Sequence, residues 1–411
     1  MHTQSKHSKN QVLAKKTSQS RIYNRRLVFD SLRIHMALSK AELARETNLT
    51  PQTIANIIDD LKADDYVLET GRRTTPRGQP PIVIEINPHG GYSVGVRIDH
   101  KRYDIVISNL LGKILFNVDG KTPDKDAEGL IEFIADATNA AIIKSKLPKK
   151  RFLGVGLVTP GPFDTHWPQE QSPGSLPGFQ SRAVKEVLSE KIRLPVLLEN
   201  DAAAAAIGEL LFGVDRNIRN FFYLFIAEGI GAGLVWNGQL YRGAKGNAGE
   251  FGHHIIDPDG KPCYCGNKGC LGQYLSLASL YEHLRQHGIS PDGPDKLEAL
   301  LAENNPALVE WINTATTALR PAIASVENLL EPEVIILGGT APVALLEAIN
   351  AQLEPLFPSI NAGKKQARII LGENTCQSIA QGAAAIPIIA ATSPNPTIFT
   401  SGESIAFERN F

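Results

Sequence analysis

The cysteines and histidines of one short stretch are the side chains best suited to hold a metal ion. Three of the four cysteines, Cys263, Cys265 and Cys270, fall within eight residues, and His253 and His254 precede them. Three thiolates and one imidazole complete a tetrahedral Zn²⁺ shell, and a shell without an open position is typical of a structural ion. A disulfide and uncoordinated thiols are the other readings, and nothing in the sequence points to the oxidising compartment that a disulfide needs. The spacing therefore predicts a structural zinc site.

The length and composition of the chain indicate what kind of protein carries this site. Its 411 residues allow two or three domains, and 43% hydrophobic with 21% charged residues is the balance of an ordinary soluble protein. No apolar run reaches the length of a membrane span, and the basic N-terminus lacks the apolar centre of a signal peptide. We therefore expect a cytoplasmic protein without a membrane segment, and such a reducing compartment suits thiolate ligands.

Charge is distributed unevenly along the chain. Residues 1–80 contain 14 Lys and Arg against 8 Asp and Glu, a formal charge of +6, whereas the remaining residues contain 28 against 35, a formal charge of −7. A basic head on an acidic body indicates that the head meets a polyanion. Residues 1–20 hold four lysines, no acidic residue and many polar residues, so we expect a basic disordered arm there.

Residues 21–86 carry the signals of a winged helix-turn-helix. The segment 21–34 predicts a first helix, and Ser39 with a glutamate three positions later forms a capping-box pattern at the start of a second. Thr50, followed by a proline, fits the N-cap of a third helix, in which apolar residues then recur at helical spacing and predict one buried face.

The predicted third helix and the loop after it present side chains suited to double-stranded DNA. Strands are expected at 66–70 and 82–86, and the basic loop between them is the wing. In this fold the third helix enters the major groove, while wing arginines reach the backbone or the minor groove. The alternative is a protein-interaction module whose polar face is merely solvated, and the charge and the wing favour DNA. The residues that we expect to contact DNA are Ser39, Thr50, Gln52, Thr53, Asn56, Arg72, Arg73 and Arg77.

The remainder of the chain reads as alternating strands and helices that form a two-lobed α/β body. Two similar α/β units in sequence predict a cleft between the lobes. The expected boundaries are a smaller lobe over 87–200 completed by about 377–392, a larger lobe with the zinc site over 201–376, and a loose tail over 393–411.

Short motifs in the body are similar to those of the ROK family, which groups bacterial sugar kinases with sugar-responsive repressors. Within residues 90–390 they occur in the order Gly154-Val-Gly-Leu-Val-Thr-Pro-Gly-Pro162, Glu199-Asn200-Asp201, Ala248-Gly249-Glu250-Phe-Gly-His253, the cysteine cluster and Gly338-Gly339-Thr340. The resemblance implies an actin/hexokinase-like body, and the winged helix-turn-helix matches the repressor branch. It also implies His253, rather than His254, as the zinc ligand that joins Cys263, Cys265 and Cys270.

The same resemblance implies a sugar site. In ROK kinases the aspartate that matches Asp201 deprotonates the attacking sugar hydroxyl, and the residue that matches Asn200 binds sugar hydroxyls. The residues that match Glu250 and His253 also line that site. Carboxylates and amides discriminate hydroxyls by hydrogen bonds, and a nearby ion fixes the loop that carries them. The alternative for Asn200 and Asp201 is a plain helix cap ahead of the alanines at 202–206.

The phosphate-binding motifs of the kinases are altered in this chain. The kinase pattern Asp-x-Gly-Gly-Thr is replaced by Arg97-Ile-Asp-His-Lys101, and the pattern Gly-Thr-Gly-x-Gly by Ala227-Glu228-Gly-Ile-Gly231. Side chains stand where glycines let a backbone approach phosphate, and Glu228 sets a carboxylate against phosphate charge. Because phosphoryl transfer depends on positioning and charge neutralisation, we expect no enzyme activity. The glutamate that follows the cysteine cluster in the family is also missing: Gly272 and Gln273 stand there.

The combined reading is a repressor that binds a DNA operator as a homodimer or higher oligomer and responds to a sugar or sugar phosphate. Two heads of a dimer require half-sites about 34–36 Å apart or multiples of that distance. Two alternatives remain open. One is an ATP-dependent sugar kinase with a DNA-binding head, against which Arg97 and Glu228 argue. The other is a DNA-binding protein controlled by a protein partner, with an empty cleft, an option that Gly272 keeps open.

Overall fold

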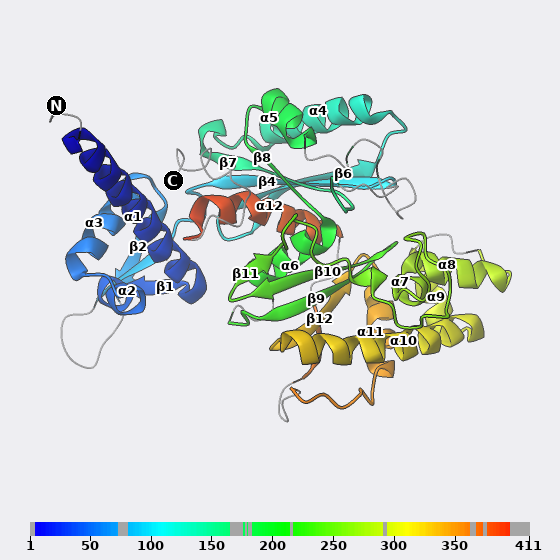
Figure 1. Cartoon of the computed structure of the whole chain (residues 1–411). Helices are drawn as coiled ribbons and strands as arrows, with labels where there is room; N and C mark the ends of the chain where they lie inside the picture. Colours follow the sequence, from blue (N-terminus) through cyan, green and yellow to red (C-terminus); the bar gives the residue numbers. More distant parts are fainter. Residues whose placement is uncertain are drawn as a thin grey trace.

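The computed structural model shows a small head joined to a two-lobed body (Figure 1). It describes residues 5–72, 81–164, 176, 179, 183–213, 217–290, 294–361, 367–372 and 376–394. Among the helices in these ranges, none combines the length and the apolar character that a membrane crossing requires.

The head is a three-helix unit with a small antiparallel sheet. Its elements in chain order are α1 (Ser5–His35), β1 (Ala37–Ser39), α2 (Lys40–Thr47), α3 (Pro51–Ala63), β2 (Val67–Arg72) and β3 (Ile82–Ile86), and the sheet order is β1-β3-β2. Three helices followed by the hairpin of β2 and β3 are the order of elements that the sequence predicted for this head. The predicted capping box at Ser39 and Glu42 and the predicted cap at Thr50 are both present. The three-residue strand β1 was not predicted, because it is too short to show a period of two.

The head has a core of its own, to which each helix contributes one apolar face. Phe29 and Leu32 of α1 and Ile58 of α3 are fully buried, and the ring of Phe29 meets Tyr66 edge-on at a centroid distance of 6.3 Å. The helical spacing that predicted the buried face of α3 is therefore confirmed.

The N-terminal segment differs from its prediction. A disordered arm was expected over residues 1–20, but α1 begins at Ser5 and continues without interruption to His35. No proline occurs before Pro51 and no glycine before Gly71, and lysine, glutamine, alanine and leucine are good helix formers. A helix already nucleated by the packed residues 21–35 can therefore extend toward the N-terminus at little cost.

The first lobe is built on a five-stranded mixed sheet of order β6-β5-β4-β7-β8. Strands β4 and β5 pair antiparallel, as do β5 and β6, whereas β7 and β8 continue the sheet in parallel. Helices α4 and α5 cover one face of this sheet, and α12 covers the other (Figure 1). The bounds are β4 Tyr92–Ile98, β5 Arg102–Asn109, β6 Ile114–Lys121, α4 Ala127–Ser145, β7 Phe152–Val158, α5 Val184–Ile192, β8 Val196–Glu199 and α12 Cys376–Thr392.

The second lobe repeats this plan with the order β11-β10-β9-β12-β13. Helix α6 lies on one face of its sheet, and the long helix α10 packs with α11 on the other (Figure 1). The bounds are α6 Asp201–Phe212, β9 Phe221–Ile226, β10 Ile230–Trp236, β11 Gln239–Tyr241, α7 Gly272–Leu275, α8 Leu277–Gln286, α9 Pro294–Ala302, α10 Pro306–Leu330, β12 Val334–Gly339, α11 Val343–Gln352 and β13 Ile369–Leu371. The predicted two-lobed α/β body is confirmed.

Helices α6 and α12 form the layer between the two sheets, and small residues let them approach closely. A Cβ added at Gly382 would lie 2.2 Å from the carbonyl oxygen of Ala204. Glycines on the strands do the same for α12: a Cβ at Gly95 would lie 1.9 Å from the carbonyl oxygen of Ala380. The alanine-rich and glycine-rich segments of the sequence therefore let the two lobes pack closely through α6 and α12.

The head is fastened to the first lobe by polar contacts around Arg151. Its guanidinium pairs with Asp65 of the head at 2.5 Å and donates to the carbonyl oxygen of His89 at 3.2 Å. The Asn87 side-chain amide donates to the carbonyl oxygen of Asp65 at 2.7 Å. These contacts tie the turn after α3 to the edge of the body.

Candidate binding cleft and metal centre

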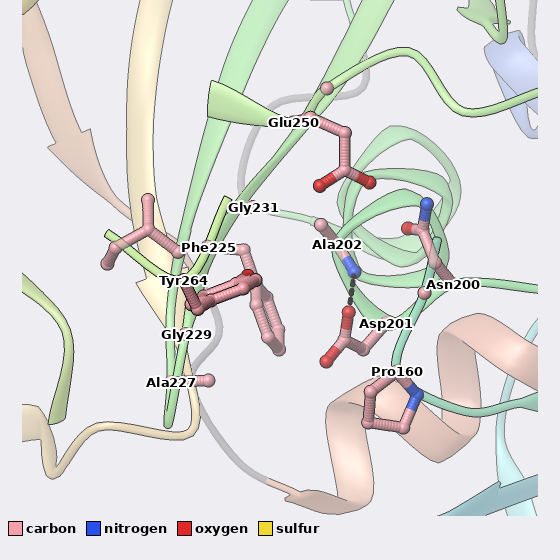
Figure 2. Close-up of a pocket in the computed structure, with 13 residues that line it drawn as sticks. Pro160, Asn200, Asp201, Ala202, Phe225, Ala227, Gly229, Gly231, Glu250 and Tyr264 are labelled. Atoms are coloured by element: carbon pink, nitrogen blue, oxygen red, sulfur yellow. Dashed lines mark hydrogen bonds between the residues drawn. The ribbon is translucent and has the colours of Figure 1, made fainter. Parts of the chain in front are cut away.

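A polar cleft lies where the C-terminal end of β8 and the start of α6 face the turn between β9 and β10 (Figure 2). It is bounded on one side by the first lobe and on the other by the second lobe and the segment before the cysteine cluster. The lining residues are Pro160, Gly161, Asn200, Asp201, Ala202, Phe225, Ala227, Gly229, Ile230, Gly231, Gly249, Glu250 and Tyr264.

The start of helix α6 sets the positions of Asn200 and Asp201. Asn200 is the N-cap: its side-chain oxygen accepts a hydrogen bond from the backbone amide of Ala203 at 2.7 Å. The Asp201 carboxylate accepts one from the amide of Ala202 at 2.9 Å. Both residues also line the cleft, so the helix-cap reading and the binding-site reading describe the same two side chains. The cap fixes the Asn200 amide, which leaves its NH₂ group as a donor on the cleft wall.

The two carboxyl groups of the cleft hold protons more tightly than ordinary carboxyls. Burial raises the pKa of Asp201, against the opposing effects of the Ala202 amide and the Arg97 charge. Burial and the charge of Asp201 raise the pKa of Glu250 to about 7. Glu250 is reached by solvent through the open cleft, but the walls around it remove much of its hydration. Near neutral pH this pair therefore offers both a hydrogen-bond donor and acceptors, a combination that suits hydroxyl groups.

The altered phosphate motifs face each other, and side chains connect them. Arg97 is buried and its guanidinium bonds to Asp104 at 3.0 Å and to Asp99. In the turn that follows, Lys101 forms an ion pair with Glu228, which lies on the β9–β10 turn of the other lobe. The predicted loss of the phosphate site thus corresponds to an ion pair between the two lobes, made by two residues far apart in sequence.

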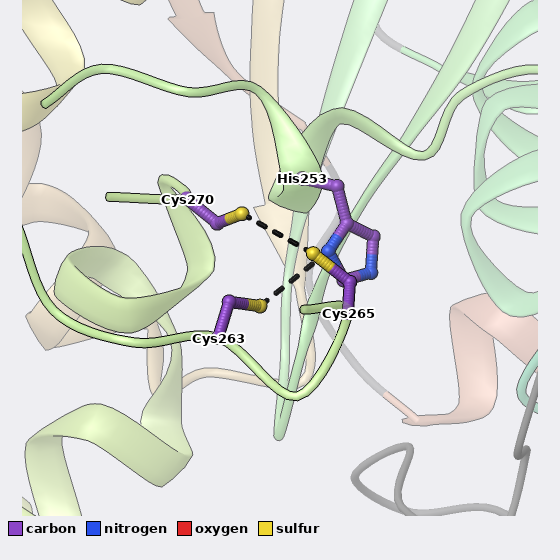
Figure 3. Close-up of side chains that lie close together, drawn as sticks. All are labelled: His253, Cys263, Cys265 and Cys270. Atoms are coloured by element: carbon purple, nitrogen blue, oxygen red, sulfur yellow. Dashed lines mark hydrogen bonds between the residues drawn. The ribbon is translucent and has the colours of Figure 1, made fainter. Parts of the chain in front are cut away.

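The cysteine cluster forms a compact four-ligand centre in which the ligand atoms lie within 4.8 Å of one another (Figure 3). The Cys265 and Cys270 sulfurs are 3.5 Å apart, and the Cys263 sulfur is 3.6 Å from Nδ1 of His253. A tetrahedral zinc ion with Zn–S bonds of about 2.3 Å places neighbouring ligands about 3.8 Å apart, so these spacings fit the ion. Burial and the neighbouring thiols raise the pKa of Cys270 to about 12, as expected for a buried sulfur surrounded by other thiols.

The loop around this centre is closed by its own backbone. Short bridges join Ile255 to Cys270 and Pro262 to Lys268. Gly269 has a φ of +67°, and a Cβ there would lie 1.5 Å from the carbonyl oxygen of Asp257, so no other residue fits at this turn. The ring nitrogen Nε2 of His253 lies 3.0 Å from the hydroxyl of Tyr264, which leaves Nδ1 directed at the sulfurs.

The four residues that the resemblance assigned to a sugar site line two adjoining hollows, which share Gly229, Ile230 and Tyr264. Asn200, Asp201 and Glu250 share the cleft, whereas His253 lines a second hollow beside the cysteine cluster. Gln273 lies in that second hollow as well and donates to the Cys263 sulfur at 3.5 Å.

Sequence reasoning missed Tyr264, which lines both the cleft and the second hollow. Its position between two predicted zinc ligands, Cys263 and Cys265, was the available signal, because a zinc loop fixes whatever side chain it carries.

On the head, the predicted DNA-contacting residues fall into four groups. Gln52 and Asn56 are exposed on α3 and bond to each other at 3.0 Å. The hydroxyls of Thr50 and Thr53 bond to each other at 2.8 Å at the start of that helix. Ser39 departs from its prediction: it is only 5% exposed, because its hydroxyl accepts a bond from the Glu42 amide in the capping box. Arg73, Arg77 and the side chain of Arg72 lie outside the described residues.

Comparisons with known proteins agree with the resemblance. A family model described as "ROK family" matches residues 93–388. The xylose repressor of Bacillus spizizenii is 27% identical over 355 residues, which cover 85% of this chain and 92% of the relative. A crystal structure of a ROK family transcriptional regulator, described as a homologue of the Escherichia coli MLC protein, has a TM-score of 0.72 at 24% identity and covers 90% of this chain and 96% of its own.

An enzyme shares the fold of the body. The ROK hexokinase from Thermus thermophilus has a TM-score of 0.56 at 28% identity and covers 72% of this chain and 97% of its own. The family model spans most of the body and includes the cleft, the altered phosphate motifs and the cysteine centre. This chain therefore belongs to the ROK family.

Proposed function

We propose that the protein is a sugar-responsive transcriptional repressor whose cleft binds a sugar without phosphorylating it. The observation that carries this proposal is the ion pair between Lys101 and Glu228, which occupies the place where the kinase resemblance puts two phosphate-binding turns. The names of relatives such as the xylose repressor support the regulatory reading. The winged helix-turn-helix supplies the head that such a regulator needs.

The cleft supplies hydrogen-bonding groups for a sugar, but it does not supply the unpaired positive charge that the phosphates of ATP require. Asn200 offers an amide donor, and Asp201 and Glu250 offer carboxyl groups of raised pKa. A triphosphate with Mg²⁺ requires backbone amides and cations around the transferred group. The Glu228 carboxylate would instead repel it, and the Lys101 charge is already paired with Glu228. A bound sugar therefore acts as an effector rather than a substrate.

In the head, α3 is the element that would lie in the major groove. Its exposed amide side chains, Gln52 and Asn56, can pair with adenine edges, and Thr50 and Thr53 at its start lie where phosphate contacts form. Binding as a homodimer would place two such helices in successive major grooves. The arginines of the wing would add phosphate or minor-groove contacts, which makes operator affinity depend steeply on salt.

The route from the cleft to the head runs through the first lobe. The effector would contact both lobes, and Arg151 of the first lobe pairs with Asp65 in the turn after α3. An effector shifts operator binding only to the extent that it binds one arrangement of lobes and heads more tightly than the other. The zinc ion held by His253, Cys263, Cys265 and Cys270 would have a structural role, since it fixes the loop that carries Tyr264 into the cleft.

The proposal is tested by screening purified protein against pentoses, hexoses and their phosphates by thermal shift and following hits by calorimetry. Asp201→Asn should weaken the best hit at least about tenfold, since it removes a charged acceptor from a desolvated site. Asp136→Asn, on the exposed face of α4, is the matched control and should change nothing. ATP-dependent phosphorylation of the hit would establish the kinase instead, and the absence of any sugar binding would favour control by a protein partner.

A further inference from the structure

A cluster of potential metal ligands lies outside the cleft and the cysteine centre, where α8 meets the start of α10. His283 and His287 stand one turn apart on α8, and Glu310 lies on the neighbouring helix. Each residue can offer one ligand atom, a ring nitrogen or a carboxylate oxygen, and one such set of three atoms lies within 4.8 Å of one another. The two imidazole rings have centroids 4.4 Å apart.

Hydrogen bonds to carbonyl groups fix which nitrogen of each imidazole is available. Nε2 of His283 lies 2.9 Å from the carbonyl oxygen of Ala307, and Nδ1 of His287 lies 2.9 Å from the carbonyl oxygen of His283. A carbonyl oxygen only accepts, so both of these nitrogens carry the proton. In a neutral ring the other nitrogen then presents its lone pair, which is Nδ1 for His283 and Nε2 for His287. Metal-binding histidines are oriented in the same way, with the second nitrogen donating to a carbonyl or carboxylate.

The third ligand is close to this pair. The Glu310 carboxylate lies 3.7 Å from Nε2 of His287. Two imidazoles and one carboxylate are a ligand set for a borderline divalent cation such as Zn²⁺, with water completing the shell. His283 also lines the hollow beside the cysteine cluster, which gives an ion a path from solvent.

We propose that His283, His287 and Glu310 form a second divalent transition-metal site that fastens α8 to α10. The site is distinct from the Cys3His centre in its ligands, which are nitrogen and oxygen rather than sulfur. Because it is open to solvent, its ion exchanges more readily than the one held by thiolates. The competing explanation is an ordinary ion pair between His287 and Glu310 that holds no metal.

The test uses full-length protein whose Cys3His centre is loaded and which has been dialysed against a weak chelator. Zn²⁺ is then added in a calorimeter. Mass spectrometry first counts the ions that remain bound after dialysis. Wild type should then bind one further equivalent of Zn²⁺ per chain. His287→Gln and His283→Gln should each lower that affinity at least about tenfold, since even the loss of an outer-shell partner costs about 10–100-fold. His35→Gln is the matched control. His35 also pairs with a glutamate, Glu46, at 3.1 Å, but among the described residues this pair belongs to no group of three metal ligands.

Co²⁺ provides a second readout that does not depend on heats of binding. Cobalt in the proposed site should show an absorption spectrum without sulfur-to-cobalt charge transfer, and that spectrum should disappear in His287→Gln while the zinc in the cysteine centre stays unchanged. A wild-type protein that takes up no metal beyond the cysteine centre overturns the proposal. Unchanged uptake by both histidine variants overturns it as well, because the ion would then lie elsewhere.

Discussion

Reversing the charge of one partner in the Lys101–Glu228 pair should weaken effector binding, and exchanging both charges should restore it. The cleft is lined from both lobes, so its affinity for an effector depends on the fraction of molecules whose lobes hold this arrangement. The two side chains are 58% and 29% exposed, and an exposed pair contributes about 0–1 kcal/mol. Lys101→Glu removes this attraction and adds a repulsion of about 1 kcal/mol between carboxylates about 4 Å apart in water-like surroundings.

The single variant should therefore weaken effector binding about 5- to 30-fold. The double variant, Lys101→Glu with Glu228→Lys, should recover most of the loss. The recovery is incomplete because Lys101 also lies 6.0 Å from the ring centroid of Tyr281, a contact that the exchange removes. The difference between the variants should shrink at about 1 M salt, where the Debye length falls to about 3 Å.

The assay is calorimetry with the sugar that stabilises wild type most in a thermal-shift panel. Circular dichroism and zinc content check that the variants are folded. Lys144→Glu, which reverses an exposed lysine in the last turn of α4, is the matched control. If Lys101→Glu binds the sugar as tightly as wild type, or if the exchanged pair is as weak as the single variant, the lobes are not coupled through this contact.

Three other outcomes are expected. Cys263→Ser should release the ion from the cysteine centre and weaken effector binding about 10–100-fold, measured by metal analysis and calorimetry, and full zinc occupancy would refute the ligand assignment. The Glu250 carboxyl has a folded-state pKa of about 7, above its ordinary value of 4.5, so its contribution to stability is complete below pH 4.5 and declines as pH rises through 7. The melting temperature should therefore fall less between pH 5 and 8 for Glu250→Gln than for wild type. An equal fall in both proteins would show that the Glu250 carboxyl does not have a raised pKa. Gln52→Ala or Asn56→Ala should weaken operator binding by about 1–3 kcal/mol in fluorescence anisotropy, with Asn139→Ala on the body as control, and unchanged affinity for both would move base recognition to the wing.

Much of the local structure was predictable because its signals are local. Ser39 with Glu42, and Thr50 with the following proline, mark helix starts through groups only three residues apart. The cysteine centre was predictable for the same reason, since its three cysteines lie on one loop. The two-lobed body followed from a regular alternation of fully buried strands and amphipathic helices.

The parts that were missed depend on contacts between distant segments. Lys101 and Glu228 are separated by 127 residues, and only the folded lobes bring them together. The sequence showed each as a departure from a kinase motif but not that they pair. Tyr264 and Gln273 are two more examples, because their positions depend on how the cysteine loop packs against α7. The histidines of α8 were overlooked because Glu310, the ligand that makes them a site, belongs to another helix.

The central claim is that a kinase-like body senses a sugar without ATP and reports it to a DNA-binding head. The most direct measurement is the affinity of the purified protein for a duplex selected from a randomised library, followed by anisotropy with and without the sugar in the absence of ATP. We expect tight binding at low salt that the sugar alone weakens, with Asp201→Asn binding the duplex but failing to respond. Duplex binding that ignores the sugar, or that changes only while ATP is consumed, would contradict the account.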